Sequence, residues 1–213
     1  MIGGTVRYAV LLGHLQRADA LPAALISFLP PPRYIHSAGT ASLAVNLARK
    51  YGYENLPGIN AAGWLHDAAR ILDPGEARVA ANEGGWPPDE NETAAGEMSH
   101  GPAGGALVAA LGWGEDLAAA VRYHVTGRPA APLADKILMA ADAAEPSRVY
   151  DGVEVVREAL EASLDLAVVL WIKLKLEYVR RAGEAEHPRA VKTLAGFPPA
   201  LLVEAETRLR LRR

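Results

Sequence analysis

The sequence predicts an all-α protein. Alanine and leucine dominate the composition, and apolar residues recur at the three- and four-residue spacing of amphipathic helices. β-Branched residues are mostly scattered and do not alternate along short runs as they would in strands. Glycine and proline separate the apolar stretches, as they do between packed helices. With 213 residues, half of them hydrophobic, the chain can bury one sizeable core.

The chain divides into a short lead-in segment and one main domain. Residues 1–30 form the lead-in segment, with a short helix over 19–29 that the three prolines at 30–32 stop. Residues 31–213 form the domain, in which the polar stretch 82–97 is a long surface loop with room for one turn of helix. We expect the helices of this domain over 37–51, 57–72, 101–111, 115–125, 133–144, 153–182 and 198–213.

Composition excludes several classes of function. The chain has no cysteine, so disulfides, thiolate metal sites and thiol nucleophiles are ruled out. A net charge of −3 lacks the basic excess of a general nucleic-acid binder. The N-terminus lacks the pattern of a signal peptide, and the most apolar later segment, 164–176, contains two lysines and is too short to span a bilayer. We therefore expect a cytoplasmic protein that binds neither nucleic acid nor membrane.

The dipeptide His66-Asp67 is the first candidate for a functional site. It follows the apolar segment 61–65 near a predicted helix end, where charged residues are rarely buried unless they are paired or bind a metal. A helix C-terminus also favours a nearby cation. Other metal-type side chains lie at predicted helix ends or inside an apolar run: His36, which precedes the helix over 37–51, and His100, His124 and Asp142.

These six residues occur in the order H…HD…H…H…D. Four imidazoles and two carboxylates suit a dinuclear centre in which one carboxylate bridges both ions. The set fits iron, manganese, cobalt or zinc better than magnesium, which prefers oxygen ligands. Two such ions activate a bridging water and bind the oxygens of a phosphoryl group. A single histidine is more often structural, which is how we interpret His14 and His187.

Five segments carry a more specific pattern than the HD pair alone: RYIHS (33–37), AAGWLHDAAR (61–70), SHGPAGG (99–105), YHVTGRP (123–129) and DKILMAADAAEPSR (135–148). Together they resemble the HD superfamily and, more closely, the YqeK-type symmetrical bis(5'-nucleosyl)-tetraphosphatases. The HD pair is common to a broad superfamily, whereas the combination of HGP, H-x-TG and ADxxEPxR is much more restricted. The resemblance covers about residues 33–188 and implies an HD-domain helical bundle.

The resemblance implies two iron-type ions that share Asp67 as a bridging ligand. One ion would be held by His36, His66, Asp67 and Asp142. The other would be held by Asp67, His100 and His124. The implied substrate is diadenosine tetraphosphate, a dinucleoside polyphosphate, which a hydroxide activated by the ions would cut in the middle to give two ADP. The resemblance also implies a homodimer.

Further residues would contact the substrate. Asp67 and Arg70 would be catalytic, and Arg70 stands where the family usually has lysine, which keeps the charge but changes the geometry. Ala143 and Ala144 stand where the family often has bulky residues, a difference that would alter the nucleoside pocket. Phosphate partners would be Arg70 with Arg33, Lys136, Arg148 and the backbone around Thr126 and Gly127.

Three other functions compete with this interpretation. A mononucleotide phosphatase with one metal needs only H…HD…D, which would leave His100 and His124 without a role. A di-iron oxygenase would consume oxygen, whereas a phosphohydrolase works without air. A non-catalytic nucleotide sensor is disfavoured by the complete set of metal-type residues.

Overall fold

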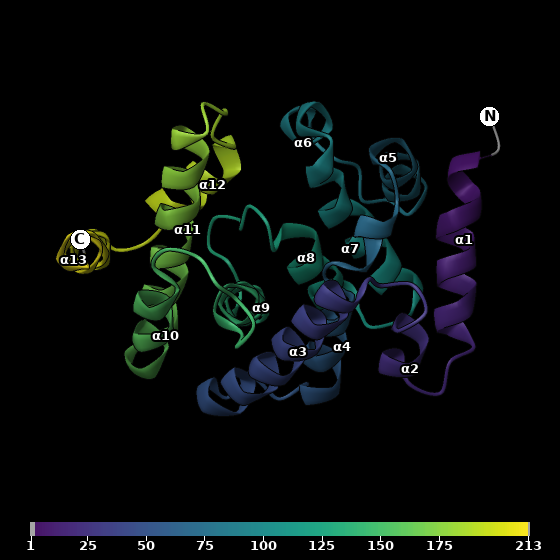
Figure 1. Cartoon of the computed structure of the whole chain (residues 1–213), viewed down its shortest axis with the longest axis horizontal. Helices are drawn as coiled ribbons and strands as arrows, with labels where there is room; N and C mark the ends of the chain where they lie inside the picture. The colour runs from purple at the N-terminus through teal and green to yellow at the C-terminus, as the bar shows by residue number, and fades with distance from the viewer. Residues whose placement is uncertain (1–2, 213) are drawn as a thin grey trace.

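The computed structural model describes residues 3–212, with side chains from Val6 onward. All regular elements in this range are helices, and strands are absent from it, which confirms the predicted all-α fold class (Figure 1). Two short 3-10 helices, η1 (Ala68–Ile71) and η2 (Glu97–Ser99), accompany the α-helices. The α-helices are α1 (Gly3–Gln16), α2 (Leu21–Leu25), α3 (Pro31–Tyr51), α4 (Leu56–Leu65), α5 (Pro74–Glu83), α6 (Glu90–Ala95), α7 (His100–Ala110), α8 (Glu115–Tyr123), α9 (Leu133–Ala144), α10 (Val153–Ala162), α11 (Leu164–Arg181), α12 (Pro188–Ala195) and α13 (Pro199–Leu211).

The hydrophobic core surrounds α9, which packs against α3, α8, α10 and α11 (Figure 1). Every residue of α9 from Ile137 to Ala144 is buried. A helix that is apolar on nearly all sides belongs in the interior of a bundle. Asp142 is the one charged side chain in this stretch, so the fold places a carboxylate inside its own core.

Glycines allow the helices around the core to pack with their backbones close together. A Cβ atom on Gly63 of α4 would lie 2.5 Å from the Cα atom of Ala41 on α3. A Cβ atom on Gly101 of α7 would lie 2.9 Å from the carbonyl oxygen of Arg122 on α8. Both contacts are closer than any larger residue tolerates. They draw together the helices and helix ends that carry the histidines.

The lead-in segment contributes to the same core as the rest of the chain. α1, which we did not predict, packs against α5 and buries Leu11 and Leu15. The helix expected over 19–29 is only the short α2, and Leu25 and Leu29 of this region are also buried in the core cluster that contains α9.

The proline run begins a helix as well as ending a segment. We predicted a helix from Ser37 with His36 before it, and this boundary is wrong, because α3 begins at Pro31. Proline has a fixed φ and no backbone N–H, and both properties suit the first turn of a helix. His36 therefore lies inside α3, on the face that packs against α9.

The stretch 82–97, predicted as a long surface loop with room for one turn of helix, contains the six-residue α6, and α5, which we did not predict, ends at its start. Each of these helices begins with a capping box. In α6, the backbone N–H of Glu92 donates to Asp89 Oδ1 at 2.9 Å, and Glu92 Oε2 accepts from the N–H of Asp89 at 2.8 Å. Asp73 caps α5 in the same way, so Pro74 starts a helix and does not follow one.

Two predicted helices are each divided. The helix expected over 57–72 ends as α4 at Leu65, and η1 follows, so His66 and Asp67 lie at the junction. The helix expected over 153–182 breaks at Ser163, whose hydroxyl accepts from the N–H of Leu166 and caps α11. α12 is a further helix that we did not predict. No helix within residues 3–212 has both the length and the apolar character to cross a bilayer.

Candidate metal centre

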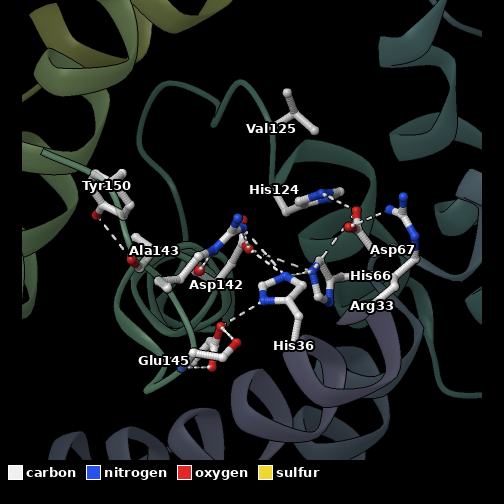
Figure 2. A network of polar contacts seen from close by, with 12 residues as sticks. Arg33, His36, His66, Asp67, His124, Val125, Asp142, Ala143, Glu145 and Tyr150 are labelled. Carbon is white, nitrogen blue, oxygen red and sulfur yellow. Dashed lines mark hydrogen bonds and ion pairs between the residues drawn. The ribbon is translucent and has the colours of Figure 1, made fainter. Parts of the chain in front are cut away.

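Six buried side chains from five parts of the fold meet beside α9, and Figure 2 labels all of them except His100. The imidazole of His36 comes from α3, and Asp142 faces it from α9. The junction between α4 and η1 supplies His66 and Asp67, the start of α7 supplies His100, and the end of α8 supplies His124. The structure thus brings together all six residues that we predicted as metal ligands.

The first group of contacts joins α3, α4 and α9. The Nε2 atom of His36 lies 3.0 Å from Asp142 Oδ1 and 3.0 Å from the Nε2 atom of His66. His66 Nε2 is 3.6 Å from the same oxygen of Asp142. Three potential ligand atoms therefore face a common point, as Figure 2 shows around His36.

The second group of contacts surrounds Asp67. Its Oδ1 atom lies 3.4 Å from His100 Nε2 and 3.7 Å from His124 Nε2. These two nitrogens are 3.3 Å apart. The same oxygen is 4.0 Å from His66 Nε2 in the first group, so Asp67 lies between the two groups and is placed to bridge them.

Hydrogen bonds at Nδ1 fix which nitrogen of each ring faces the centre. The Nδ1 atoms of His66, His100 and His124 lie 2.8, 2.5 and 2.7 Å from the backbone carbonyl three residues earlier. A carbonyl only accepts, so each Nδ1 carries the hydrogen and each Nε2 presents a lone pair. His36 Nδ1 is held in the same way by Glu145 Oε1 at 3.0 Å (Figure 2).

These side chains fit metal ions. Within each of three overlapping groups, the potential ligand atoms lie within 4.8 Å of one another. Lone pairs on Nε2 atoms this close repel one another unless a cation or a proton lies between them. Histidines that bind metals commonly donate their other ring N–H to a carbonyl or carboxylate, as all four do here. Nitrogen and oxygen ligands together suit transition metals.

Electrostatics favour the protonation states that metal binding requires. Burial opposes ionisation of Asp142, but the charge of Arg148 and the nearby imidazoles of His36 and His66 hold the pKa of Asp142 well below its usual range. Burial also opposes ionisation of Asp67, yet His66 and its other partners hold the pKa of Asp67 well below the usual range. Burial lowers the pKa values of His100 and His124. Two carboxylates are thus ionised beside the neutral imidazoles of His100 and His124.

His66 differs from the other histidines in this respect. Burial lowers its pKa, but Asp67 and Asp142 together raise it above the usual value. Without a cation, a proton on His66 is therefore stabilised by both carboxylates. A metal ion would replace this proton, because a ligating imidazole nitrogen must be unprotonated.

Three of the predicted phosphate-binding arginines lie at the opening of the centre. Arg33 Nη1 is 3.1 Å from Asp67 Oδ2, and Arg70 Nε is 2.7 Å from Asp67 Oδ1. Arg148 forms a short ion pair with the Asp142 carboxylate, and its Nε donates to the backbone oxygen of Asp142 at 2.7 Å. All three line a cavity of about 520 Å³ that we call the first cavity, and Asp67 and Asp142 form part of its wall.

The other residues predicted to contact or shape the substrate site do not line the first cavity. Lys136 forms an ion pair with Asp165 at 2.8 Å and lies beside Phe197, away from the centre, so the geometry gives it no contact with a substrate there. Thr126 is buried, and its hydroxyl donates to the carbonyl oxygen of Gly127 at 3.0 Å. Ala143 and Ala144 are buried in the core and do not line the first cavity.

The two histidines that we interpreted as structural lie outside the cluster. His14 packs its ring against Phe28, with the ring centroids 5.1 Å apart. His187 caps α12 and lies 3.3 Å from Asp89 Oδ1. Asp89, Glu92 and His187 are close enough to form a small cluster of their own, but Arg122 and Arg189 neutralise its carboxylates.

Sequence reasoning missed two residues that contact this region. Glu145 holds His36, and its place in the motif EPSR was the available signal. Lys175 of α11 reaches the carbonyl oxygen of Val125 at 2.7 Å, directly after His124. Burial lowers the pKa of Lys175 to about 8, with Asp142 opposing the shift and Arg70 adding to it. The available signal was its charge within the apolar segment 164–176, which we used only as evidence against a membrane span.

Comparisons with known proteins show the family to which the chain belongs. Residues 33–147, more than half of the chain, match the HD domain family. A Bacillus subtilis protein named "Bis(5'-nucleosyl)-tetraphosphatase, symmetrical" is 31% identical over 179 residues, which span 82% of this chain and 93% of that protein. A Halalkalibacterium halodurans protein of the same name is 31% identical over 172 residues, which span 80% of this chain and 89% of that protein.

One solved structure is similar to this chain, and the match covers nearly the whole length of the solved protein. It is described as a predicted HD superfamily hydrolase involved in NAD metabolism from Clostridium acetobutylicum. The TM-score is 0.78 at 28% identity, and the match covers 87% of this chain and 97% of that one. From the family match, the similarity to these relatives and the shared fold together, we conclude that the chain belongs to the HD domain family and, within it, to the family of the symmetrical bis(5'-nucleosyl)-tetraphosphatases.

Proposed function

We propose that this protein hydrolyses diadenosine tetraphosphate at the middle of its tetraphosphate and releases two ADP. The observation that carries the proposal is the pair of ligand groups that share Asp67 beneath a cavity with three arginines. The relatives named as symmetrical tetraphosphatases match nearly their full length, which supports the same reaction here.

The proposed dinuclear centre divides the six ligands between two sites. His36, His66 and Asp142 would hold one ion, and His100 and His124 would hold the other, with Asp67 shared. Iron is the ion we propose, and manganese, cobalt and zinc suit the same ligands. Such a pair of ions, when bound, lowers the pKa of a shared water and neutralises charge on phosphoryl oxygens.

The protein's own side chains would orient the substrate and stabilise charge. Arg33, Arg70 and Arg148 are partly exposed toward the first cavity, so their remaining N–H groups are available to phosphate oxygens. The leaving group is ADP, whose terminal phosphate is a stable anion. Stabilisation of that anion by the guanidinium groups is therefore more important than donation of a proton to it.

One assay tests the proposal. Purified protein loaded with iron, and in parallel with manganese, cobalt or zinc, is incubated with diadenosine tetraphosphate, and the nucleotides are separated by chromatography. ADP as the sole product supports the symmetrical cut. AMP together with ATP would show a hydrolase that cuts elsewhere, and absence of turnover with every metal would reject the proposed substrate.

A further inference from the structure

A second cavity lies beside the first, along a neighbouring face of α11. It measures about 390 Å³ and extends from His100 and Met98 toward Thr126 and Ala190. The first cavity instead opens onto Asp67, His124 and Asp142 and extends toward Trp171 and Arg212. Each cavity therefore reaches ligand residues of the candidate metal centre, but from a different direction.

The two cavities share one wall. Arg70, Val125, Lys175 and Tyr178 line both of them. The wall is held together by the hydrogen bond from Lys175 Nζ to the carbonyl oxygen of Val125, which ties α11 to the turn that follows His124 (Figure 2 shows Val125 above His124). Two cationic side chains thus stand where one cavity passes into the other.

We propose that each cavity binds one nucleoside of a dinucleoside polyphosphate, so that the polyphosphate crosses the shared wall between Arg70 and Lys175. This inference rests on the proposed function and adds a binding mode to it. A ligand that is held at both ends on opposite sides of one wall has its midpoint at the wall, beside the metal centre. The arrangement accounts for a cut in the middle of the substrate.

The contents of the first cavity suit a nucleobase and its ribose. The rings of Tyr150 and Trp171 lie with their centroids 5.4 Å apart and form an aromatic surface in the cavity wall. An aromatic surface of this kind can stack against a nucleobase.

The second cavity, like the first, is lined by both apolar and polar side chains. Met98, Ile172 and Leu176 provide apolar surface, and Thr126 and His187 provide polar groups. Small-molecule sites typically measure about 300–1,000 Å³, and both cavities lie in the lower part of this range. Each is therefore large enough to hold one nucleoside.

The test counts nucleotides bound to the whole protein. ADP is titrated into the metal-loaded protein, and the stoichiometry is measured by calorimetry. Ala95→Trp places an indole at the rim of the second cavity, and Ala185→Trp does so from another segment of the rim. Ala94→Trp is the matched control, because Ala94 is exposed on the same helix and lines neither cavity.

We expect about two ADP per chain for the native protein and for Ala94→Trp, and about one for Ala95→Trp and Ala185→Trp. For Ala95→Trp and Ala185→Trp, kcat/KM for diadenosine tetraphosphate should also fall about tenfold or more, because the second cavity no longer holds one nucleoside of the substrate. Circular dichroism checks that every variant keeps its helical content.

Binding of only one ADP per native chain would overturn the inference. It would also be overturned if Ala95→Trp and Ala185→Trp matched Ala94→Trp in both ADP stoichiometry and kcat/KM. Failure of the proposed function looks different, because the protein would then bind two ADP per chain and still not hydrolyse diadenosine tetraphosphate.

Discussion

The orientation of single imidazole rings decides what the candidate centre is able to bind. Three of the four rings donate Nδ1–H to the carbonyl three residues earlier, so their Nε2 atoms point at one another and at Asp67 or Asp142. The same residues with the opposite tautomer would present N–H groups and repel a cation. The backbone therefore sets the chemistry of these side chains.

His100→Ala distinguishes a two-metal from a one-metal enzyme. We expect metal content to fall from about two ions per chain to about one, and kcat/KM for diadenosine tetraphosphate to fall by more than about 100-fold, because the second ion loses one of its three ligands. Elemental analysis and steady-state kinetics measure the two effects. His14→Ala is the control, since His14 packs on Phe28 away from the cluster.

A His100→Ala protein that retains its activity would instead support a mononucleotide phosphatase with one metal, in which His100 has no role.

Glu145 is a positioning residue for His36. Removal of its carboxylate in Glu145→Ala leaves His36 Nδ1 without its partner, so we expect metal affinity to fall about 10- to 100-fold. Glu145→Gln should recover part of the loss, because its amide oxygen still accepts the hydrogen bond. Metal titration followed by calorimetry measures both variants. Glu154→Ala, an exposed glutamate that pairs with Arg157, should leave the affinity unchanged.

Equal metal affinity for Glu145→Ala and the native protein would show that His36 needs no support from Glu145.

At the scale of the elements, one buried carboxylate joins three helices. Glu92 of α6 accepts from Arg122 Nη1 of α8 at 2.5 Å and from Arg189 Nη1 of α12 at 2.7 Å. Burial opposes its ionisation, but the hydrogen bond and charge of Arg122 hold the pKa of Glu92 below its usual value of 4.5. The ion pairs therefore fasten the wall of the second cavity to the rest of the bundle.

The free energy of unfolding should fall when Glu92 becomes protonated. Because its pKa is lower in the folded protein, its contribution is present above pH 4.5 and is lost as the pH falls through the folded-state pKa. Glu92→Gln leaves two arginines without their charge partner, so we expect a loss of about 3 kcal/mol in the free energy of unfolding at pH 7. The loss of stability on acidification should be smaller in this variant. Urea unfolding at several pH values measures both effects.

Glu90→Gln is the matched control on the same helix, since Glu90 is exposed. If Glu92→Gln and Glu90→Gln showed the same pH dependence of unfolding, the network would not contribute to acid stability.

At the scale of the whole molecule, the segment before residue 31 belongs to the common core. Leu11 on α1 is fully buried, whereas its neighbour Val10 is 54% exposed. We expect Leu11→Ala to reduce the free energy of unfolding by about 2–5 kcal/mol, because it leaves a cavity in the core, and Val10→Ala to have little effect. Denaturant unfolding measures both. A reduction for Leu11→Ala no larger than for Val10→Ala would mean that α1 folds as an independent appendage.

The six metal-type residues of the centre were predictable from the sequence, because the HD pattern consists of particular residue types in a fixed order. Charged and imidazole groups inside apolar segments, such as Asp142 in LMAADAAEP, are costly to bury without a partner. Their presence in such a segment therefore indicates a paired or metal-binding side chain. The all-α fold class follows in the same way from helical spacing. Helix boundaries were less predictable where one signal has two meanings: Pro31 ends one segment and starts α3, and Asp89 begins a helix inside a polar stretch.

The sequence by itself thus determined the helical fold class, the HD family pattern and the set of metal-type side chains. Only the tertiary structure decided how these side chains face one another, which arginines join them, and how α11 divides the space above them into two cavities. Lys136 and Lys175 both lie on helices with many apolar residues, yet Lys136 pairs with Asp165 and Lys175 reaches Val125 beside the ligands. That difference arises from the packing of α11 across the bundle, and contacts between distant segments leave no local trace in composition or spacing.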